Sequence, residues 1–322
     1  MSSTEPTLSS GGRVLLAVLA IGFVVLLVAA AEFLLRGAGL GTPIVYDGSK
    51  LWGYTPQPGQ SVERFGGARI TIDDAGLRVS PDLDPSRPGR VVFLGDSITY
   101  GGSYIDDKDL FSSIACSASS QFSCWNAGVN GWGVMNAVAR SRFDERLPAP
   151  QVIVFTFITG DFYRGLVPSN AAHFMLRQPN QLVPALHEAL NFIATRYSPK
   201  KYLGKCCGRP LTPEEERNEQ RLAMTWAFEL LGDEIRRLEE AGRTVLLAHS
   251  PDRASFETGE QDEMTDYLFE LADRAGIEIL DLLVPLKRSG LTADEIYYDK
   301  VHYDAAGHRV VGEFFKARLH DR

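Results

Sequence analysis

The sequence is short of positive charge, and this shortage excludes one class of partner. Its 33 lysines and arginines are outnumbered by 41 aspartates and glutamates, which gives a formal net charge of −8. Proteins that bind nucleic acids usually gather basic residues to neutralise phosphates, so we expect no nucleic-acid partner. Internal repeats and low-complexity tracts are also lacking, and 322 residues are enough for one large α/β domain with appendages.

Cysteine is scarce as well. The four cysteines stand at positions 116, 124, 206 and 207, so none forms a C-x-x-C pair, and no histidine follows at a zinc-finger spacing. We therefore expect no metal site. In an oxidising compartment Cys116 and Cys124 could close a short loop by a disulfide, while two buried free thiols fit the sequence equally well. A bridge between the adjacent Cys206 and Cys207 would be strained, and the sequence does not decide their pairing.

The long hydrophobic run of the chain lies near the amino terminus. Residues 1–13 are polar and rich in serine and glycine, which is typical of a disordered tail. Residues 14–31 then contain no charged side chain, and apolar residues continue past Glu32 to Leu35. A helix of this length spans about 33 Å, enough to cross the hydrocarbon core of a bilayer. Residues 14–36 therefore predict a transmembrane anchor that contacts the membrane from Val14 to Leu35.

A cleaved signal peptide is the alternative for this segment. Arg13 would supply its basic region, and the three alanines at positions 29–31 its cleavage site. The apolar run is long for a signal peptide, which favours an uncleaved anchor. Arg13 and Arg36 give little charge asymmetry across the run, but in both cases the remainder lies outside the cytoplasm if the tail stays inside. We expect a membrane-anchored protein whose main domain is periplasmic or at the cell surface.

Beyond the anchor, the pattern indicates a small β-rich segment followed by a large α/β domain. Residues 37–85 contain short β-type pieces around an Asp73-Asp74-Ala75-Gly76 turn, which predicts a small hairpin packed against the main domain. Between residues 86 and 322 buried-strand patterns alternate with helical patterns, so we expect a parallel sheet with helices on both faces. The expected strands cover residues 91–95, 124–127, 152–157, 244–248 and 277–280.

The helical patterns give two further expectations. Residues 162–211 interrupt the alternation of strands and helices, and a segment of this length is often an insert or lid. The helix after it has a clear start, with Thr212, Pro213 and Glu215 in the order of a capping box. Its apolar residues at helical spacing are expected to face the core. They are Leu222, Trp226, Leu230 and Ile235.

The first candidate catalytic residue follows the apolar strand at residues 91–95. Gly95 ends this strand, and Asp96 and Ser97 stand at its carboxyl end. Ligands of open α/β sheets bind outside the carboxyl ends of the strands, so Ser97 is a candidate nucleophile. Taken alone, the same residues fit a plain helix cap equally well.

A second candidate group lies close to the carboxyl terminus. Asp304 is a good N-cap for a last helix, which leaves Asp299 and His302 on the loop before it. Three residues apart in such a loop, the carboxylate can bind the imidazole Nδ1–H while Nε2 faces outward, as in a Ser-His-Asp triad. Taken alone, a pair of solvated loop residues would be the commoner case.

In this order the two blocks resemble the SGNH/GDSL-type hydrolases, specifically the membrane-anchored bacterial kind. The resemblance runs from the end of the apolar run through the sequence GDSITYG to DKVHYDAAGH. It implies an α/β, flavodoxin-like three-layer fold in which Ser97 is the nucleophile, His302 the base and Asp299 the residue that orients the base. An N-x-G-x-x-G match further implies that the backbone N–H groups of Ser97 and Gly131 form the oxyanion hole.

The third block of the family is where the sequence departs from the pattern. The usual G-x-N-D reads Ile158-Thr159-Gly160-Asp161 here, with Gly160 in place of the asparagine whose amide faces the oxyanion. Losing one such donor typically lowers kcat by on the order of 10²–10³. Asn130 or Thr159 could supply part of the missing contact, and Asp161 is expected to be a structural turn residue.

The resemblance implies one function, and the departure of the sequence from the third block of the family motivates another. The first is a serine esterase or acyltransferase outside the cytoplasm, with a small acyl ester or an acylated, above all acetylated, carbohydrate of the envelope as substrate and no cofactor. The second is an anchored binding or assembly protein that keeps the fold but has lost turnover, because of the glycine at position 160.

Overall fold

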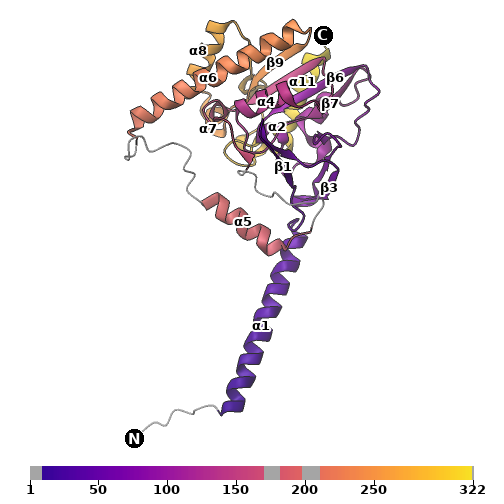
Figure 1. Cartoon of the computed structure of the whole chain (residues 1–322), viewed down its shortest axis with the longest axis vertical. Helices are drawn as coiled ribbons and strands as arrows, with labels where there is room; N and C mark the ends of the chain where they lie inside the picture. The colour runs from indigo at the N-terminus through magenta and orange to yellow at the C-terminus, as the bar shows by residue number, and fades with distance from the viewer. Residues whose placement is uncertain (1–8, 170–181, 198–210, 321–322) are drawn as a thin grey trace.

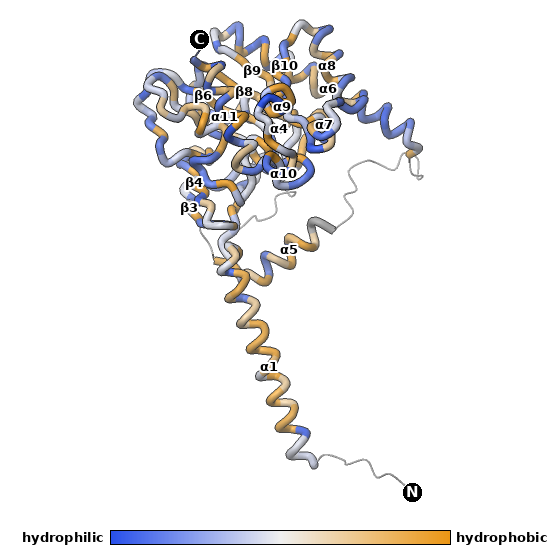
Figure 2. The backbone as a smooth tube through the Cα atoms, turned by 180° about the vertical axis from the view of Figure 1, so that it is seen from behind, coloured by the Kyte–Doolittle hydropathy of each residue, from blue (hydrophilic) through white to orange (hydrophobic). Residues whose placement is uncertain are grey.

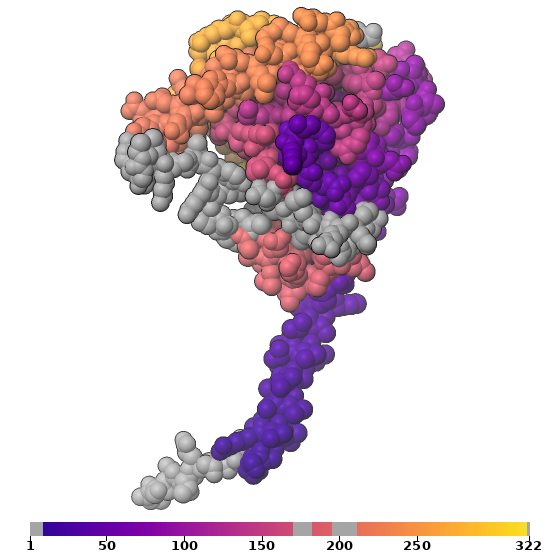
Figure 3. Space-filling view, in the orientation of Figure 1, coloured from indigo at the N-terminus to yellow at the C-terminus, as the bar shows by residue number. Residues whose placement is uncertain are grey.

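The computed structural model describes residues 9–169, 182–197 and 211–320 of the chain. One long helix, α1 (Ser10–Gly37), projects away from the body that contains the sheet and most of the other helices (Figures 1 and 3). It is hydrophobic along most of its length, and none of its residues is buried (Figure 2). The helix is long and apolar enough to cross a membrane, a test that a signal sequence at this end of a chain also passes.

An eight-stranded sheet forms the centre of the body, with strand order β10-β9-β8-β6-β7-β5-β4-β3. The five strands from β10 to β7 pair in parallel. If they are numbered 1 to 5 along the chain, starting with β6, their order across the sheet from β7 to β10 is 2-1-3-4-5, which is the flavodoxin-like arrangement. The predicted parallel sheet is thus present, although its last strand begins two residues later than the pattern indicated, at Ile279 rather than Ile277. These strands are β6 (Gly89–Gly95), β7 (Phe122–Asn126), β8 (Val152–Phe157), β9 (Thr244–His249) and β10 (Ile279–Asp281).

Alternate side chains of the central strands face two separate hydrophobic cores. In β6, Val92 and Leu94 point into one core, and Val91 and Phe93 into the other. Helices therefore cover both faces of the sheet, which gives three layers. The helices on the first core are α4 (Val134–Phe143), α6 (Pro213–Glu240) and α8 (Glu263–Ala275). Those on the second are α3 (Phe111–Ala115), α9 (Leu283–Arg288) and α11 (Ala305–His320).

The β-rich segment after α1 extends the central sheet. The hairpin expected around the Asp73 turn is formed by β4 (Arg69–Ile72) and β5 (Arg78–Val79), and β5 pairs antiparallel with β7. The expectation that it only packs against the main domain was therefore incomplete, since β7 would otherwise expose an unpaired edge. The remaining strands are β3 (Gln60–Glu63), which pairs with β4, and the separate hairpin of β1 (Tyr46–Ser49) and β2 (Gly53–Pro56).

Several short helices connect these elements. Leu110 separates η2 (Asp107–Asp109) from α3, so two short helices follow each other here. Of the expected insert at residues 162–211, the structure describes α5 (Ala185–Tyr197), and Cys206 and Cys207 lie outside the described residues. The other short helices are η1 (Phe65–Gly67), α2 (Ser97–Tyr100), η3 (Thr159–Phe162), α7 (Arg253–Thr258) and α10 (Ala293–Ile296).

Helix α6 begins at its predicted cap but buries only part of the stripe that was expected to face the core. The Thr212 side chain accepts the Glu215 N–H at 3.2 Å, as a capping box requires. Ile235 is buried and Leu230 packs against the core, as expected, whereas Leu222 and Trp226 are exposed. Two apolar stripes run along this helix at helical spacing, and the sheet mainly covers the one that contains Met224 and Phe228. Its buried apolar residues are Met224, Ala227, Phe228, Leu231, Ile235 and Leu238.

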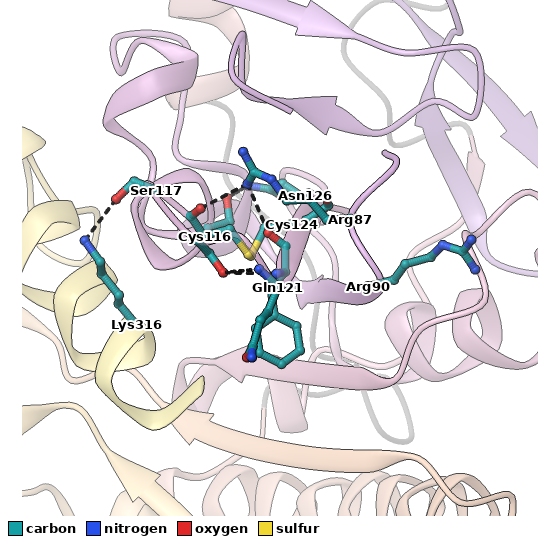
Figure 4. Close-up of a disulfide and its surroundings, with 12 residues drawn as sticks. Arg87, Arg90, Cys116, Ser117, Gln121, Cys124, Asn126 and Lys316 are labelled. Atoms are coloured by element: carbon teal, nitrogen blue, oxygen red, sulfur yellow. Dashed lines mark hydrogen bonds between the residues drawn. A yellow bond between two sulfur atoms is a disulfide. The ribbon is translucent and has the colours of Figure 1, made fainter. Parts of the chain in front are cut away.

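The structure decides between the two states that the sequence left open for the first cysteine pair. Cys116 and Cys124 form a disulfide with a Cα–Cα distance of 5.7 Å, which joins the end of α3 to β7 (Figure 4). Arg87 donates to the carbonyl of Cys116 at 3.3 Å, and Lys316 of α11 donates to the Ser117 hydroxyl at 3.3 Å. Both sulfurs lie in buried residues, so the bridge ties α3 to the sheet from within the second core.

Candidate active site

The expected nucleophile lies where the strand order of the sheet reverses. β6 pairs with β7 on one side and with β8 on the other, although β7 and β8 both follow it in the chain. In doubly wound sheets ligands bind outside the carboxyl ends of the strands at this point. Ser97 follows β6 directly and Thr159 follows β8, so the first and third sequence blocks meet here.

Two local features fix Ser97 at the start of α2. Asp96 Oδ1 accepts the Ile98 N–H at 2.9 Å, which is the N-cap bond that the sequence offered as the alternative role of this motif. Gly95 allows the turn to lie against β8, because a side chain there would collide with the carbonyl of Thr156. The cap is thus made by one oxygen of the aspartate, and the serine hydroxyl lies 3.4 Å from the other, Asp96 Oδ2.

Backbone contacts close the loop that carries the other two candidate residues. The N–H of Tyr298 donates to the carbonyl of His302 at 2.9 Å, and Tyr297 forms an antiparallel bridge with Tyr303. Asp299 therefore lies at the tip of a tight turn, directly before α11. The turn is anchored to the segment after β9 by the N–H of Arg253, which donates to the carbonyl of residue 300 at 2.8 Å.

The structure brings the three candidate residues into one hydrogen-bonded row. Ser97 Oγ lies 2.8 Å from His302 Nε2. His302 Nδ1 lies 2.9 Å from Asp299 Oδ2 and 3.0 Å from Oδ1. The side chains of His302 and Asp299 are 28% and 33% exposed, so the row is open to a small molecule at one side.

The carboxylate of Asp299 is held in its charged form. Burial raises its pKa, but hydrogen bonds from the His302 ring and from the N–H groups of Val301 and His302 outweigh burial and leave the pKa well below its ordinary value. An ionised carboxylate can only accept at Nδ1, so the neutral form of the imidazole holds its proton on Nδ1 and turns the lone pair of Nε2 toward Ser97.

The glycine-rich second block lies at the same edge of the sheet. Gly131 is exposed and has φ 80°, a conformation that glycine adopts readily. The side-chain amide of Asn130 donates to the Tyr46 hydroxyl at 3.3 Å, and the carbonyl of Asn130 accepts from the Tyr54 hydroxyl at 2.7 Å. The small β1–β2 hairpin, which carries both tyrosines, therefore holds this block in place.

In the third block the side chain of Thr159 is bonded to two neighbouring residues. Its Oγ1 lies 2.9 Å from His249 Nε2 and 2.6 Å from Thr265 Oγ1. Burial lowers the pKa of His249 to about 4, so this imidazole is neutral at physiological pH. The hydroxyl of Thr159 thus has two partners in the wall of the site.

Asp161 and Gly160 form the turn itself. Asp161 Oδ2 accepts the Ile158 N–H at 3.2 Å, the turn-capping role expected from the sequence, and its other oxygen pairs with Arg164 at 2.9 Å. Burial and the neighbouring Asp96 charge raise the pKa of Asp161. At Gly160 there is room for a side chain, since the nearest atom to an added Cβ is the Tyr163 hydroxyl at 3.6 Å.

Sequence reasoning missed a buried arginine that supports the segment carrying the candidate nucleophile. Arg78 of β5 pairs with Asp107 at 2.8 Å, and neither side chain is exposed. The same guanidinium donates to the carbonyls of Tyr100 at 2.8 Å and Gly102 at 2.7 Å, so it fixes the chain just after α2. Nothing in its short β-type sequence distinguishes it from a solvent-facing arginine.

A stacked aromatic pair beside the triad was also missed. The rings of Tyr104 and Tyr298 lie 3.8 Å apart at 16°, and the Tyr104 hydroxyl donates to the carbonyl of Tyr303 at 3.2 Å. Tyr298 directly precedes Asp299, which is the one sequence signal that could have pointed to it. Within residues 9–169, 182–197 and 211–320, no group of three or more His, Cys, Asp or Glu side chains is placed to hold a metal ion.

Residues 93–310 match the model of the GDSL-like lipase/acylhydrolase family. No curated protein sequence matches the chain. Among solved structures, a G-D-S-L family lipolytic protein from Desulfitobacterium hafniense DCB-2 is 14% identical over 71% of this chain and 98% of its own, with a TM-score of 0.42.

Two further solved structures are similar to the same extent. A lipase/acylhydrolase from Enterococcus faecalis is 16% identical over 73% of this chain and 96% of its own, with a TM-score of 0.43. An acetylxylan esterase from Geobacillus stearothermophilus is 14% identical over 72% of this chain and 94% of its own, also with a TM-score of 0.43. The family match covers more than half of the sequence and both blocks of the site, so the chain belongs to the GDSL-like lipase/acylhydrolase family.

Proposed function

We propose that the chain is a serine ester hydrolase or acyltransferase in which Ser97, His302 and Asp299 form the catalytic triad. The observation that carries this proposal is the unbroken row from the Asp299 carboxylate through both ring nitrogens of His302 to Ser97 Oγ. A nucleophile within hydrogen-bond reach of a base, with that base oriented by a third group, is the arrangement of nucleophilic acyl transfer.

The geometry supports a two-step reaction. Ser97 Oγ attacks the acyl carbonyl while His302 Nε2 takes its proton. The tetrahedral intermediate then collapses, His302 returns the proton to the leaving alcohol oxygen, and the acyl group remains on Ser97. Water, or an acceptor alcohol in a transferase, then attacks this acyl-enzyme and gives its proton to Nε2. The bond between the acyl carbon and Ser97 Oγ breaks, Oγ takes the proton back from His302, and the acid or the new ester leaves. Asp299 keeps the tautomer and stabilises the imidazolium without being protonated.

The oxyanion is proposed to bind to the backbone N–H groups of Ser97 and Gly131. Gly131 lies exposed at the carboxyl edge of the sheet, in the block that also carries Asn130. With Gly160 in place of a side-chain donor, two N–H groups bear most of the developing charge, and we propose a lower kcat than an intact third block would give. Asn130 and Thr159 contribute less than the sequence allowed, because Tyr46 and His249 engage their side chains.

We further propose that α1 anchors the protein in a membrane, with the catalytic domain outside the cytoplasm. An exposed apolar helix of 28 residues supports the anchor. The Cys116–Cys124 disulfide supports the compartment, because disulfides persist in oxidising surroundings. In that compartment, O-acetyl groups of carbohydrate or other envelope material are the proposed substrates.

Gly160 favours one alternative, an anchored binding protein with the same fold and no turnover. A fluorophosphonate probe separates the two proposals, because it labels only a serine that its base activates. We expect labelling of the full chain in detergent and none in Ser97→Ala. Hydrolysis of an acetyl ester should show the same dependence on Ser97. A folded wild-type protein that is neither labelled nor active would establish the binding protein instead.

A further inference from the structure

Helix α5 is fixed directly to the end of the proposed anchor. The carboxylate of Glu32 in α1 accepts the first backbone N–H groups of α5, from Ala185 at 2.9 Å and from Leu186 at 3.0 Å. Arg36 of α1 donates to the carbonyl of Val183 at 2.9 Å. An acidic side chain at these free N–H groups both caps a helix and complements its dipole. α5 therefore starts where α1 leaves its apolar stretch, and runs out sideways beneath the body (Figures 1 and 2).

One side of α5 is bound to the rest of the protein through Glu188. Its Oε2 accepts the Gly41 N–H at 2.6 Å, and its carboxylate forms an ion pair with Arg64, in which both side chains are 5% exposed. Gly41 and Arg64 belong to the β-rich segment that extends the central sheet. A buried ion pair of this kind is strongly destabilised when one partner is removed, so it fixes the rotation of α5 about its own axis.

The opposite side of α5 is apolar and exposed. Each residue turns a helix by about 100°, which places Leu186, Leu190 and Ile193 about 140–200° from Glu188. Leu190 is 59% exposed and Ile193 51% exposed. With Glu188 facing the body, these side chains point away from it. α1 also leads away from the body, and its last apolar residues are open, with Phe33 78% and Leu34 70% exposed.

We propose that α5 is an interfacial helix that lies in the head-group layer of the bilayer crossed by α1. Its Leu190 and Ile193 face enters the boundary of the acyl chains, and its Glu188 face supports the catalytic domain. A helix with one apolar and one polar face, lying flat at the surface, is the usual form of such a contact. This inference rests on the proposed membrane anchor.

The surroundings of the Leu190 and Ile193 face favour a lipid bilayer as its partner. This face starts next to the apolar surface of α1, because the capping bonds from Glu32 hold the first turn of α5 against the end of α1. Because α5 is bonded both to α1 and to the domain, immersion of α5 sets the orientation of the domain over the membrane. In Figure 2 α10, which precedes the catalytic loop, lies on the side of the body nearer α5, and the carboxyl terminus lies on the far side.

Depth measurements on the full chain in lipid nanodiscs test this inference. Cysteines are introduced singly by Leu190→Cys and Ile193→Cys, in a background where Cys206 and Cys207 are serine, and each is labelled with an environment-sensitive fluorophore. Val24→Cys in α1 is the control for the bilayer interior, and Asp233→Cys on the exposed face of α6 is the control for water. Quenching is measured with lipids that carry a nitroxide near the head group, and with iodide in solution.

We expect lipid nitroxides to quench the probes at 190 and 193 at least twofold more than the probe at 233, and iodide to show the reverse order. Probes at 190 and 193 that iodide reaches as readily as position 233 would overturn the interfacial helix. If the probe at position 24 is still protected in that case, the anchor stands and α5 alone is wrong. A probe at position 24 that iodide reaches freely would overturn the anchor and, with it, the position of α5.

Discussion

Asp299 Oδ2 lies 2.9 Å from His302 Nδ1, and the same carboxylate also accepts the backbone N–H of His302 at 2.9 Å. One residue thus fixes both the backbone and the ring of the proposed base. The pKa of Asp299 is held well below its ordinary value, so the carboxylate stays charged through the whole physiological range. The position and the tautomer of the imidazole depend on this single side chain.

Replacing this carboxylate by an amide should remove most of the activity. In Asp299→Asn the amide N–H₂ can face Nδ1, which then becomes an acceptor and leaves the proton on Nε2. Nε2 can no longer take the proton of Ser97, and we expect kcat on a soluble acetyl ester to fall by on the order of 10³–10⁴. Asp304→Asn is the matched control, because asparagine caps a helix as well as aspartate does. Similar kcat values for Asp299→Asn and wild type would contradict the triad.

Restoring the missing amide should raise activity. The nearest atoms to an added Cβ at Gly160 are the Tyr163 hydroxyl at 3.6 Å and Ile158 Cδ1 at 3.8 Å, so a side chain fits. We expect Gly160→Asn to increase kcat by up to about 10²–10³-fold, the factor by which such a donor typically changes kcat. Gly160→Ala adds the Cβ without the amide and should give no such gain. If both variants hydrolyse the ester at the wild-type rate, another group already supplies the contact.

The positions of the candidate residues were predictable because each depends on a short local pattern. An apolar run that ends in Gly95 predicts a buried strand, and the serine two residues later must then lie at the edge where ligands bind. Asp304 marks the start of the last helix, which leaves Asp299 and His302 on the loop before it. A parallel sheet brings the two ends together, and the alternation of strand and helix patterns also indicates that sheet.

The contacts that support this site were not predictable in the same way. The ion pair between Arg78 and Asp107 joins residues 29 positions apart, and an arginine in a short hairpin is usually solvated. Whether it is buried depends on the pairing of β5 with β7, which has no local signature. In α6, Trp226 and Phe228 belong to rival apolar stripes, and only the position of the sheet decides which one is buried.

Removing the disulfide should lower the free energy of unfolding by a moderate amount. The bridge closes a loop with a sequence separation of 8, for which loop-closure entropy gives about 2–3 kcal/mol. We expect a loss of this size in the double variant Cys116→Ala/Cys124→Ala, measured by denaturant unfolding of the full chain in detergent. Cys206→Ser/Cys207→Ser leaves the bridge intact and is the control. Peptide mapping without reductant should recover residues 116 and 124 cross-linked, and free thiols there would refute the bridge.

Two buried histidines should make the fold sensitive to mild acid. Burial lowers the pKa of His249 to about 4 and, together with the Arg78 charge, that of His308 to about 3. Above the ordinary value of about 6.5 both imidazoles are neutral, whether the chain is folded or unfolded. As the pH falls below this value, only the unfolded chain takes up the protons. Stability is therefore present at neutral pH and is lost as the pH falls toward 4.

His249→Gln isolates one of these contributions, because glutamine can still bond Thr159 Oγ1 but does not titrate in this range. Between about pH 7 and about pH 4.5, each such histidine weakens the fold by about 2–3 kcal/mol. We expect the difference between the free energies of unfolding at these two pH values to shrink by this amount in the variant. The exposed His187, changed to glutamine, serves as the control. An unchanged difference in His249→Gln would mean that this imidazole is already protonated in the folded protein or meets water there.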